Sequence, residues 1–270
     1  MPEGDTIYRA AERVGAALTG RRLSGVSGSA PPIRATSSQL TGARVKRVRS
    51  AGKHLLIETD ANLVIRTHLR MSGVWDVYAK GARWRHPIGA ARVVLEHDET
   101  TVVCFSAPDV SVDSPVSIQL EINHLGPDLC ADRFDRDEAV RRMEAPHKAT
   151  IAEHIADQRV MAGIGNVYKS EILFLERIHP EAPASLTETE IERVVDRSRQ
   201  LLMLNRSRPK RITTGETRRG AELWVYGRGN QPCRRCRTKI DTAWIGDLER
   251  ITYWCPNCQP SIPTGHIDRK

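Results

Sequence analysis

The first residues of the chain combine two groups that could do chemistry. If Met1 is removed, Pro2 presents a secondary amine, which can condense with an aldehyde and act as an electron sink once it forms an iminium ion. The carboxylate of Glu3 follows directly and could move a proton. The alternative interpretation is a frayed Met-Pro terminus in which Glu3 only favours the start of a helix.

A helix is predicted to begin beside this amine, with Asp5 as its N-cap. Four apolar residues follow Asp5 at helical spacing and would bury one face of that helix: Ile7, Ala11, Val14 and Leu18. The positive end of the helix dipole would disfavour the protonated amine. A neutral amine is a nucleophile, so this arrangement favours the catalytic interpretation.

Four of the six cysteines form a second candidate site. They occur as two Cys-x-x-Cys pairs with eighteen residues between the pairs: Cys233, Cys236, Cys255 and Cys258. Two such turns at this distance are typical of a tetrahedral site that holds one structural Zn²⁺. A redox pair would not be duplicated in this way, and a disulfide framework belongs to a secreted chain. Cys104 and Cys130 lie in apolar surroundings that predict core packing.

Several basic or apolar side chains are candidates for contact with a ligand. Lys53 follows Gly52 in a turn before a strand, Arg250 begins a strand-like run inside the cysteine module, and either residue could bind a phosphate or be an ordinary solvated charge. Arg70 and Met71 lie between two predicted strands. An exposed Met at such a position could enter a base stack, although Met is more often a core residue.

The segment from Gln158 to Tyr168 contains Gly163 and Gly165 and joins two predicted helices. Glycine permits close approach of the backbone to a partner, and Asn166 is predicted to cap the second helix, whose N–H groups would face an anion. An ordinary helical hairpin with Asn166 as a simple cap is an equally good interpretation.

The rest of the sequence divides into a strand-rich part and a helical part. Short strands bounded by turn residues are predicted at 45–49, 55–59, 63–67, 74–78, 91–96, 102–105 and 118–122, which is typical of a sandwich or barrel. Capping-box spacing predicts helices beginning at Asp135, Thr150 and Thr187, and the arginine-rich run 206–219 predicts a mobile basic loop. We therefore expect an α+β chain with a β-sandwich or barrel domain (1–130), a helical domain (131–225), a cysteine module (226–262) and a flexible tail (263–270).

Composition narrows the class of partner. The 270 residues include 41 Lys and Arg against 33 Asp and Glu, which gives a net charge of +8 and raises the expectation of a polyanionic ligand. No stretch approaches the roughly 20 apolar residues of a membrane span, and no secretory pattern is present. We expect a soluble cytoplasmic monomer without a small-molecule cofactor.

Five motifs in one order resemble the formamidopyrimidine-DNA glycosylase and endonuclease VIII family. They are PEGDT at 2–6, Gly52-Lys53-His54, the run His124–Leu129, the segment Asp157–Tyr168 and the knuckle Cys255-Pro-Asn-Cys258-Gln259. The resemblance implies a two-layer β-sandwich with flanking helices, a helix-two-turns-helix domain and a zinc-finger β-hairpin. It also implies that damaged double-stranded DNA is the partner, because the enzymes of this family repair DNA by base excision.

By the same resemblance, Pro2 is the nucleophile at C1′, Glu3 the general acid/base and Lys53 the lysine near the flanking phosphate. Asn166 and Arg250 would hold phosphates, and strand cleavage would proceed by β,δ-elimination. Reaching C1′ requires the nucleotide to leave the duplex, and Met71 with Arg70 would fill the vacated space.

The start PEGDT resembles the endonuclease VIII branch, which acts mainly on oxidised pyrimidines. No Arg-Arg-Phe-Gly run, the signature of the purine-directed branch, stands between Phe105 and His124. Arg70-Met71-Ser72 departs from the Gln-Leu-Tyr type of wedge of the bacterial prototype. The alternatives are a purine-directed (8-oxoguanine/formamidopyrimidine) glycosylase and a non-catalytic zinc-ribbon protein that binds nucleic acid. A damage sensor that binds without cutting would require loss of Pro2 or Glu3, and both residues are present.

Overall fold

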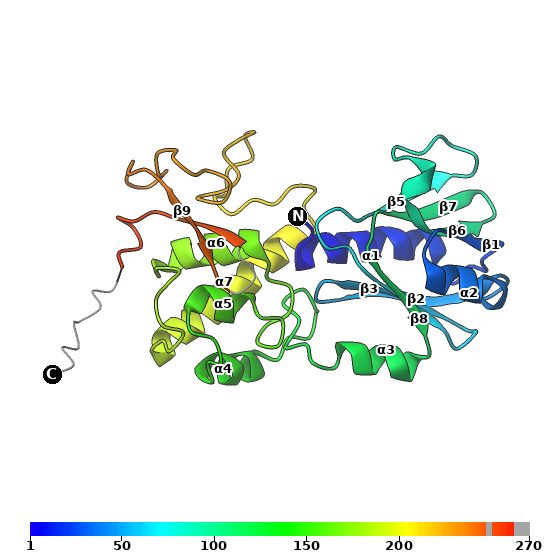
Figure 1. The fold of residues 1–270 in the computed structure, drawn as a ribbon, viewed down its shortest axis with the longest axis horizontal. Coiled ribbons are helices and arrows are strands. Elements are labelled where there is room, and N and C mark those ends of the chain that lie inside the picture. Colours follow the sequence, from blue (N-terminus) through cyan, green and yellow to red (C-terminus); the bar gives the residue numbers. More distant parts are fainter. Residues whose placement is uncertain (247–249, 262–270) are drawn as a thin grey trace.

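The chain forms two lobes that lie side by side along its long axis in a computed structural model that describes residues 1–246 and 250–261 (Figure 1). The first lobe contains α1 (Gly4–Leu18), β1 (Gly25–Ser27), α2 (Pro31–Leu40), β2 (Val45–Ala51), β3 (His54–Thr59), β4 (Val64–His68), β5 (Val74–Ala79), η1 (Ile88–Ala90), β6 (Ala91–His97), β7 (Thr100–Phe105), β8 (Asp109–Asp113) and α3 (Pro115–Ile122). The second lobe contains α4 (Arg136–Glu144), α5 (Ile151–Ala156), α6 (Asn166–Glu176), α7 (Glu188–Arg206), β9 (Asp241–Ile245) and β10 (Arg250–Trp254).

Two four-stranded antiparallel sheets make the first lobe. Their strand orders are β1-β6-β7-β5 and β2-β3-β4-β8, and the core between them includes the apolar side of α1. Ile7, Val14 and Leu18 of α1 are at most 1% exposed, as the helical spacing predicts. The predicted two-layer sandwich with flanking helices is confirmed.

The predicted strand at 118–122 is wrong, because this segment belongs to the helix α3. Pro115 occupies the first turn of α3, where its missing N–H costs nothing, and the Ser114 hydroxyl caps the helix. Ile118 and Ile122 lie one turn apart and pack on the β2-β3-β4-β8 sheet. A short run of alternating apolar residues does not distinguish such a helix from a strand.

One α-helix and two strands of the first lobe are missing from the prediction: α2, β1 and β8. Helix α2 buries only Ile33 and Leu40, so its periodicity is weak, and its interior is rich in Ser and Thr. Strand β8 is only half-buried and pairs with β4 at the edge of its sheet. α2 and β1 lie between the predicted first helix and the predicted strand at 45–49, and β8 lies between the predicted strands at 102–105 and 118–122.

The second lobe is helical, and its start signals are confirmed. Asp135, Thr150 and Thr187 are the N-caps of α4, α5 and α7, and each side chain accepts a backbone N–H three residues later. At Thr187 the full capping box is present with Glu190. No helix among the described residues is long and apolar enough to span a membrane.

Two other predicted caps are wrong. Glu3 is the N-cap of α1, and Asp5 lies in its first turn with the carboxylate directed to another element. Gly165 is the N-cap of α6, while the side-chain amide of Asn166 donates to a carbonyl of β10. In both cases the local pattern predicts that the side chain caps a helix, but the side chain hydrogen-bonds instead to a residue distant in the sequence. The tail 263–270 lies outside the described residues, and the domain boundaries at 130 and 225 stay predictions.

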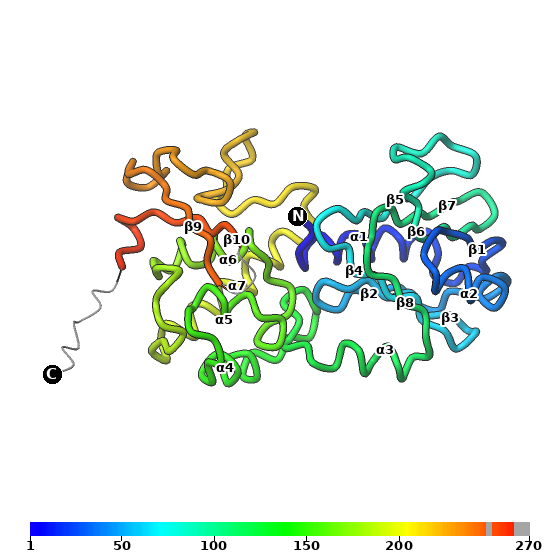
Figure 2. Tube along the Cα trace, in the orientation of Figure 1, coloured from blue at the N-terminus to red at the C-terminus, as the bar shows by residue number. Residues whose placement is uncertain are grey.

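Glycines permit the two lobes to meet closely beside the N-terminus, which lies between them (Figure 2). The N–H of Gly4 donates to the carbonyl of Gly163 at 2.9 Å, and a Cβ on Gly4 would lie 2.9 Å from the Gly163 Cα. At the β2-β3 turn, Gly52 has a φ of +56° and donates its N–H to the Asp128 carboxylate at 2.9 Å. These contacts fix the β2-β3 turn and the start of α1 against the second lobe.

Candidate active site

The carboxylate of Glu3 is fully buried at the N-terminus of α6. One oxygen accepts the N–H of Val167 at 2.8 Å, and the other accepts the N–H groups of Gly165 at 2.9 Å and Tyr168 at 3.3 Å. A Cβ at Gly165 would lie 2.5 Å from the Glu3 Cδ, so glycine is required there. The start of α6 thus holds the carboxylate in one orientation.

A cleft of about 530 Å³ opens beside Pro2, between the lobes. Five of the residues predicted from the sequence line it: Pro2, Lys53, Arg70, Met71 and Arg250. Its lining holds six basic side chains, namely Lys53, Arg70, Lys148, Arg159, Lys169 and Arg250, against two acidic ones, Glu153 and Asp157. A cleft with this excess of positive charge suits a polyanion.

Lys53 projects from the turn between β2 and β3 into this cleft. Burial lowers the pKa of Lys53 to about 8, Glu3 opposes that shift, and Arg250, Arg211 and Arg70 add to it. The Lys53 amine therefore titrates close to neutrality. Its pKa depends on the buried Glu3 carboxylate and on the neighbouring arginines.

Arg70 and Met71 form the tip of the loop between β4 and β5, which we call the wedge loop (residues 69–73). The Gly73 N–H donates to the Leu69 carbonyl at 2.8 Å and closes the loop. Met71 is 69% exposed, so the core placement that is commoner for Met does not apply. Arg70 has a φ of +48°, and its Nε donates to the Asp109 carboxylate at 2.6 Å. The tip thus presents an unbranched apolar side chain to the cleft.

Asn166 does not line the cleft, but it fastens the hairpin that carries Arg250. Its Nδ2 donates to the carbonyl of Ile251 at 2.7 Å, and its Oδ1 is buried without a protein partner among the described residues. Arg250 opens β10 and lies opposite Ile245 of β9. The side chains of Asn166 and Arg250 therefore come from two elements that hydrogen bonds hold together.

An arginine that sequence reasoning placed in a mobile loop is part of the buried site. Arg211 donates through Nε to the Asp5 carboxylate at 3.1 Å, lies 3.8 Å from a Glu3 oxygen and stacks 4.6 Å from the centre of the Tyr168 ring. Burial opposes ionisation of Asp5, yet Arg211 holds the pKa of Asp5 below its ordinary value. The one sequence signal was Ile212, an apolar residue in an otherwise polar run, which is buried here.

Two further buried charges escaped sequence reasoning. Lys169 of α6 lines the cleft and donates to the Thr252 hydroxyl at 2.7 Å, and burial with the neighbouring Arg250 lowers its pKa to about 8. Glu171 accepts the N–H groups of residues 224–226 at 2.8–2.9 Å. Lys169 and Glu171 both lie on α6. This one helix therefore orients the β9-β10 hairpin, the segment 224–226 and the Glu3 carboxylate.

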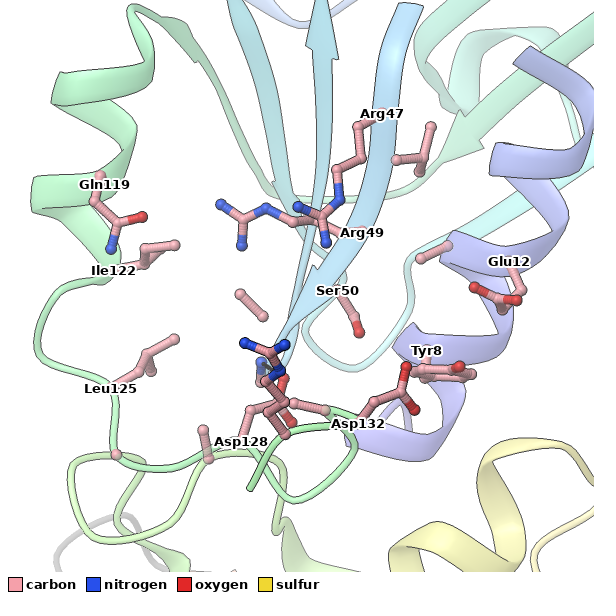
Figure 3. A pocket seen from close by; sticks show the side chains of 18 of the residues that line it. Tyr8, Glu12, Arg47, Arg49, Ser50, Gln119, Ile122, Leu125, Asp128 and Asp132 are labelled. Carbon is pink, nitrogen blue, oxygen red and sulfur yellow. Dashed lines mark hydrogen bonds between the residues drawn. The ribbon is translucent and has the colours of Figure 1, made fainter. Parts of the chain in front are cut away.

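A second cavity, of about 720 Å³, lies between α1, β2 and α3 (Figure 3). Arg47 and Arg49 of β2 point into it. Its lining includes three arginines, Arg47, Arg49 and Arg133, and three acids, Glu12, Asp128 and Asp132, so positive and negative charges balance. None of the predicted site residues lines it, so the cleft beside Pro2 is the candidate active site.

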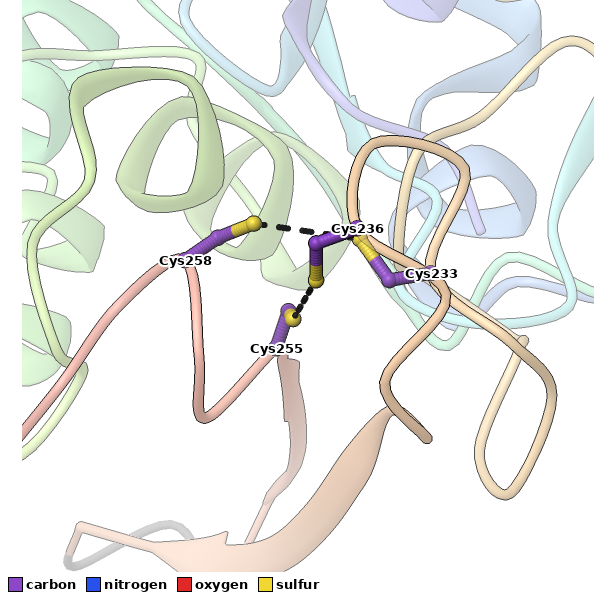
Figure 4. A group of neighbouring side chains, drawn as sticks. All are labelled: Cys233, Cys236, Cys255 and Cys258. Atoms are coloured by element: carbon purple, nitrogen blue, oxygen red, sulfur yellow. Dashed lines mark hydrogen bonds between the residues drawn. The ribbon is translucent and has the colours of Figure 1, made fainter.

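The four cysteines predicted as metal ligands meet at the base of the β9-β10 hairpin (Figure 4). Their sulfur atoms all lie within 4.8 Å of one another, and the Sγ atoms of Cys236 and Cys255 are 3.4 Å apart. Sulfurs bound to one tetrahedral Zn²⁺ at about 2.3 Å would be about 3.8 Å apart, so the arrangement fits that ion. Cys104 and Cys130 are buried in the cores of the two lobes, as predicted.

Comparison with known proteins agrees with this geometry. Residues 1–108 match the model of the formamidopyrimidine-DNA glycosylase N-terminal domain, and residues 125–213 match that of the formamidopyrimidine-DNA glycosylase H2TH domain. The chain belongs to the formamidopyrimidine-DNA glycosylase and endonuclease VIII family. Membership places it among the DNA glycosylases and lyases of base excision repair.

Relatives within the family cover nearly the whole chain. "Probable endonuclease 8 2" of Streptomyces coelicolor is 41% identical over 96% of this chain and 94% of its own. "DNA-(apurinic or apyrimidinic site) lyase Nei2" of Mycolicibacterium smegmatis is 41% identical over 96% of this chain and 99% of its own. The formamidopyrimidine-DNA glycosylase of Lactococcus lactis, solved with abasic DNA, is 22% identical and covers 96% of this chain and 100% of its own with a TM-score of 0.82, which shows the same fold.

Proposed function

We propose that this enzyme removes oxidised pyrimidines from duplex DNA and cleaves the strand through a Schiff base on Pro2. One observation carries the proposal: Pro2 opens onto a cleft with six basic side chains, and the adjoining Glu3 carboxylate is fixed by three N–H groups of α6. Removal of Met1 is a condition, because only then is the Pro2 nitrogen a secondary amine.

The chemistry follows from that amine. The Pro2 lone pair forms a bond to C1′ while the N-glycosidic bond breaks and the base leaves with the electron pair and a proton. Ring opening then yields an iminium ion, an electron sink that lets the sugar lose a proton and expel the phosphates in turn by β- and δ-elimination. Glu3 is the group that moves protons at the sugar.

The cationic lining would hold the strand during these steps. We propose that Lys53 and Arg250 bind phosphates next to the lesion, with Arg70 at the wedge loop. Asn166 would act from the start of α6, where the bond from its Nδ2 to the hairpin keeps its position fixed. Phosphate contacts of this kind position the duplex without reading its sequence.

Lesion class is the finer part of the proposal. Relatives that cover nearly the full chain are named endonuclease 8, and the sequence lacks the Arg-Arg-Phe-Gly run of the purine-directed branch between Phe105 and His124. Parallel cleavage of duplexes with thymine glycol and with 8-oxoguanine tests the choice. Preferential cleavage at 8-oxoguanine would favour the purine-directed alternative.

We propose that the four cysteines bind one structural Zn²⁺. Four sulfurs leave no open coordination position, so the ion supplies rigidity to the β9-β10 hairpin and no reaction step. The hairpin then carries Arg250 to the cleft as part of a fixed unit.

We infer that a single chain acts, in the cytoplasm and at the nucleoid when bound to DNA. Pro2, Lys53, Met71 and Arg250 of one chain line one cleft, so the site needs no second copy. Sedimentation of the protein with and without lesion DNA tests the monomer.

Borohydride trapping tests the central step. Protein without Met1 should give a covalent adduct with thymine glycol duplex that maps to Pro2, and a variant that retains Met1 should give none at that residue. A non-catalytic zinc-ribbon protein or a damage sensor would bind the duplex and leave no adduct. Intact abasic duplexes after incubation with zinc-loaded, trimmed protein would contradict the proposal.

A further inference from the structure

The segment 80–90, which joins β5 to β6 and which we call the strap, folds back across a sheet of the first lobe. It leaves β5 after Ala79, which lies opposite Thr100 of β7, and re-enters at Ala91, which lies opposite Phe105. Since Phe105 also lies opposite Val74 at the start of β5, the strap spans the length of β5, about 20 Å at ~3.4 Å per residue. Its end therefore returns to the edge of the sheet from which the wedge loop projects.

The strap is anchored on the outer face of the β1-β6-β7-β5 sheet, away from the sandwich core. The Trp84 ring lies 5.6 Å and the His86 ring 4.9 Å from the Phe105 ring, and Trp84 packs with Phe105 in a separate apolar cluster. Arg85 donates to the Asp76 carboxylate at 2.8 Å and lies over the Tyr78 ring. These contacts order a segment that would otherwise be an exposed loop.

The strap carries exposed positive charge. Arg83 is exposed and has no ion pair within residues 1–246 and 250–261, and the Arg85 side chain is 66% exposed although it pairs with Asp76. A guanidinium has five donors, so one carboxylate leaves most of the Arg85 donors free. The acids Asp98 and Glu99 lie at the opposite end, beside Lys80, so the net positive charge falls at Arg83 and Arg85.

Contacts connect the end of the strap to the wedge loop. The Ser106 N–H donates to the carbonyl of Ala90 at 2.8 Å, and the Ser72 hydroxyl donates to the carbonyl of Ser106 at 3.2 Å. Ile88 and Met71, 80% and 69% exposed, therefore belong to one continuous edge. In Figure 1 the strap rises above β5 and β7 on the side of the molecule where residues 207–240 rise over the other lobe.

We propose that the strap is a second DNA-binding element, in which Arg83 and Arg85 contact phosphates of the duplex arm that leaves the cleft past Met71. A surface hollow of about 540 Å³ bounded by residues 82–88 gives a phosphodiester room between these side chains. The inference rests on the proposed function, because it takes lesion-containing duplex DNA as the ligand. The contact adds affinity and no chemistry, since the strap lies outside the cleft of Pro2 and Glu3.

The test measures binding of an uncleavable abasic-analogue duplex of about 30 base pairs, or ~100 Å at ~3.4 Å per base pair, across a salt series. Arg83→Gln removes one exposed charge of the strap, and Arg34→Gln removes an exposed charge from α2 as the matched control. Arg83→Gln should weaken binding at low salt and reduce the slope of log K against log salt by about 1, whereas Arg34→Gln should leave both unchanged. Single-turnover cleavage at saturating enzyme should be the same in all three proteins.

Trimming the duplex separates a local contact from a general charge effect. When the arm on the wedge-loop side is cut to a few base pairs, wild type and Arg83→Gln should bind equally, whereas trimming the other arm should preserve the difference. An unchanged salt slope in Arg83→Gln, an equal loss in Arg34→Gln, or a loss that persists on both trimmed duplexes would overturn the inference. Those results leave borohydride trapping intact, whereas failure of wild type to trap would overturn the proposed function.

Discussion

Arg211 and Asp5 form a buried ion pair across 206 positions of sequence, and this pair ties the start of α1 to the loop after α7. The Asp5 side chain is fully buried and that of Arg211 is 12% exposed. Glu3 precedes Asp5 by two residues and lies 3.8 Å from the same guanidinium. The pair therefore helps to fix the N-terminal segment on which Pro2 stands.

Removing one partner should destabilise the protein strongly, because the other charge is left buried and unpaired. We expect Arg211→Gln to lower the free energy of unfolding by about 3–5 kcal/mol, the usual cost of breaking a buried pair. Lys210→Gln, at the exposed neighbouring position, should change it little. Denaturant titration checks this, and equal values for the two variants would contradict a stabilising role.

The same pair predicts part of the acid sensitivity. Because Arg211 holds the pKa of Asp5 below its ordinary value of 3.8, the stabilisation is complete above pH 3.8 and is lost as the pH falls through the lowered value. Asp5→Asn should therefore flatten the stability profile below about pH 4. Unfolding midpoints between pH 2 and 6 measure the effect.

Gly165→Ala should impair catalysis while the fold persists. The added Cβ would lie 2.5 Å from the Glu3 Cδ, so the carboxylate must move, and a misplacement of about 1 Å can cost on the order of 100-fold in rate. Gly89→Ala is the control, because a Cβ there meets nothing within 4 Å. Single-turnover cleavage of abasic duplex compares them; a Gly165→Ala variant with wild-type rate would show that the Glu3 position is not critical.

The lowered pKa of Lys53 predicts an alkaline limb in the rate profile. If the ammonium form binds the flanking phosphate, kcat/KM should fall above pH about 8, where the free enzyme loses that charge. Arg stays charged throughout, so Lys53→Arg should move the limb upward, and the exposed Lys46→Arg should not. A limb unchanged in Lys53→Arg would assign it to another group.

The sequence predicts those site residues whose chemistry is contained in a short motif. It does not predict residues whose partners are distant in the sequence. Pro2, Lys53 and the cysteines stand in short motifs whose chemistry is evident from the residues themselves, and the structure brings the first two into one cleft and the cysteines into one cluster. Arg211 and Glu171 escaped because their partners lie about 50 or more residues away, so no spacing rule connects them.

The errors in the fold have the same origin. The four residues at helical spacing in α1 and the capping boxes predict their helices because each signal lies within a few residues. Helix α3 was taken for a strand because Ile118 and Ile122 face a sheet that the local sequence does not contain. Asp5 and Asn166 satisfy cap patterns, yet Arg211 and the Ile251 carbonyl are better partners in the folded protein.

Met71→Ala should reduce excision from duplex DNA and spare single strands. As proposed, the exposed Met71 side chain at the wedge loop would offset the few kcal/mol of unstacking that base extrusion costs, and a single strand has no such cost. We expect about a tenfold loss on duplex, roughly 1.4 kcal/mol, and little change on single-stranded DNA. Val116→Ala, at an exposed apolar residue of α3, is the control. An equal loss on both substrates would point to a contact other than stacking.

Removal of zinc should abolish cleavage while the first lobe stays folded. The cysteine cluster lies in a small core of its own with Phe174, Val225 and Ile240 at the base of the β9-β10 hairpin, so loss of the ion would loosen that end of the hairpin. Loss of Zn²⁺ would release Arg250 from the cleft and break the hydrogen bond from Lys169 to Thr252. None of these residues is part of the core of the first lobe, so that lobe should stay folded. A chelator should eliminate strand cleavage and lower the protection of β10 amides from hydrogen exchange, while the amides of β3 and β7 keep theirs. Added Zn²⁺ should restore both signals, and full cleavage by a zinc-free protein would show that the cysteine cluster is dispensable for the site.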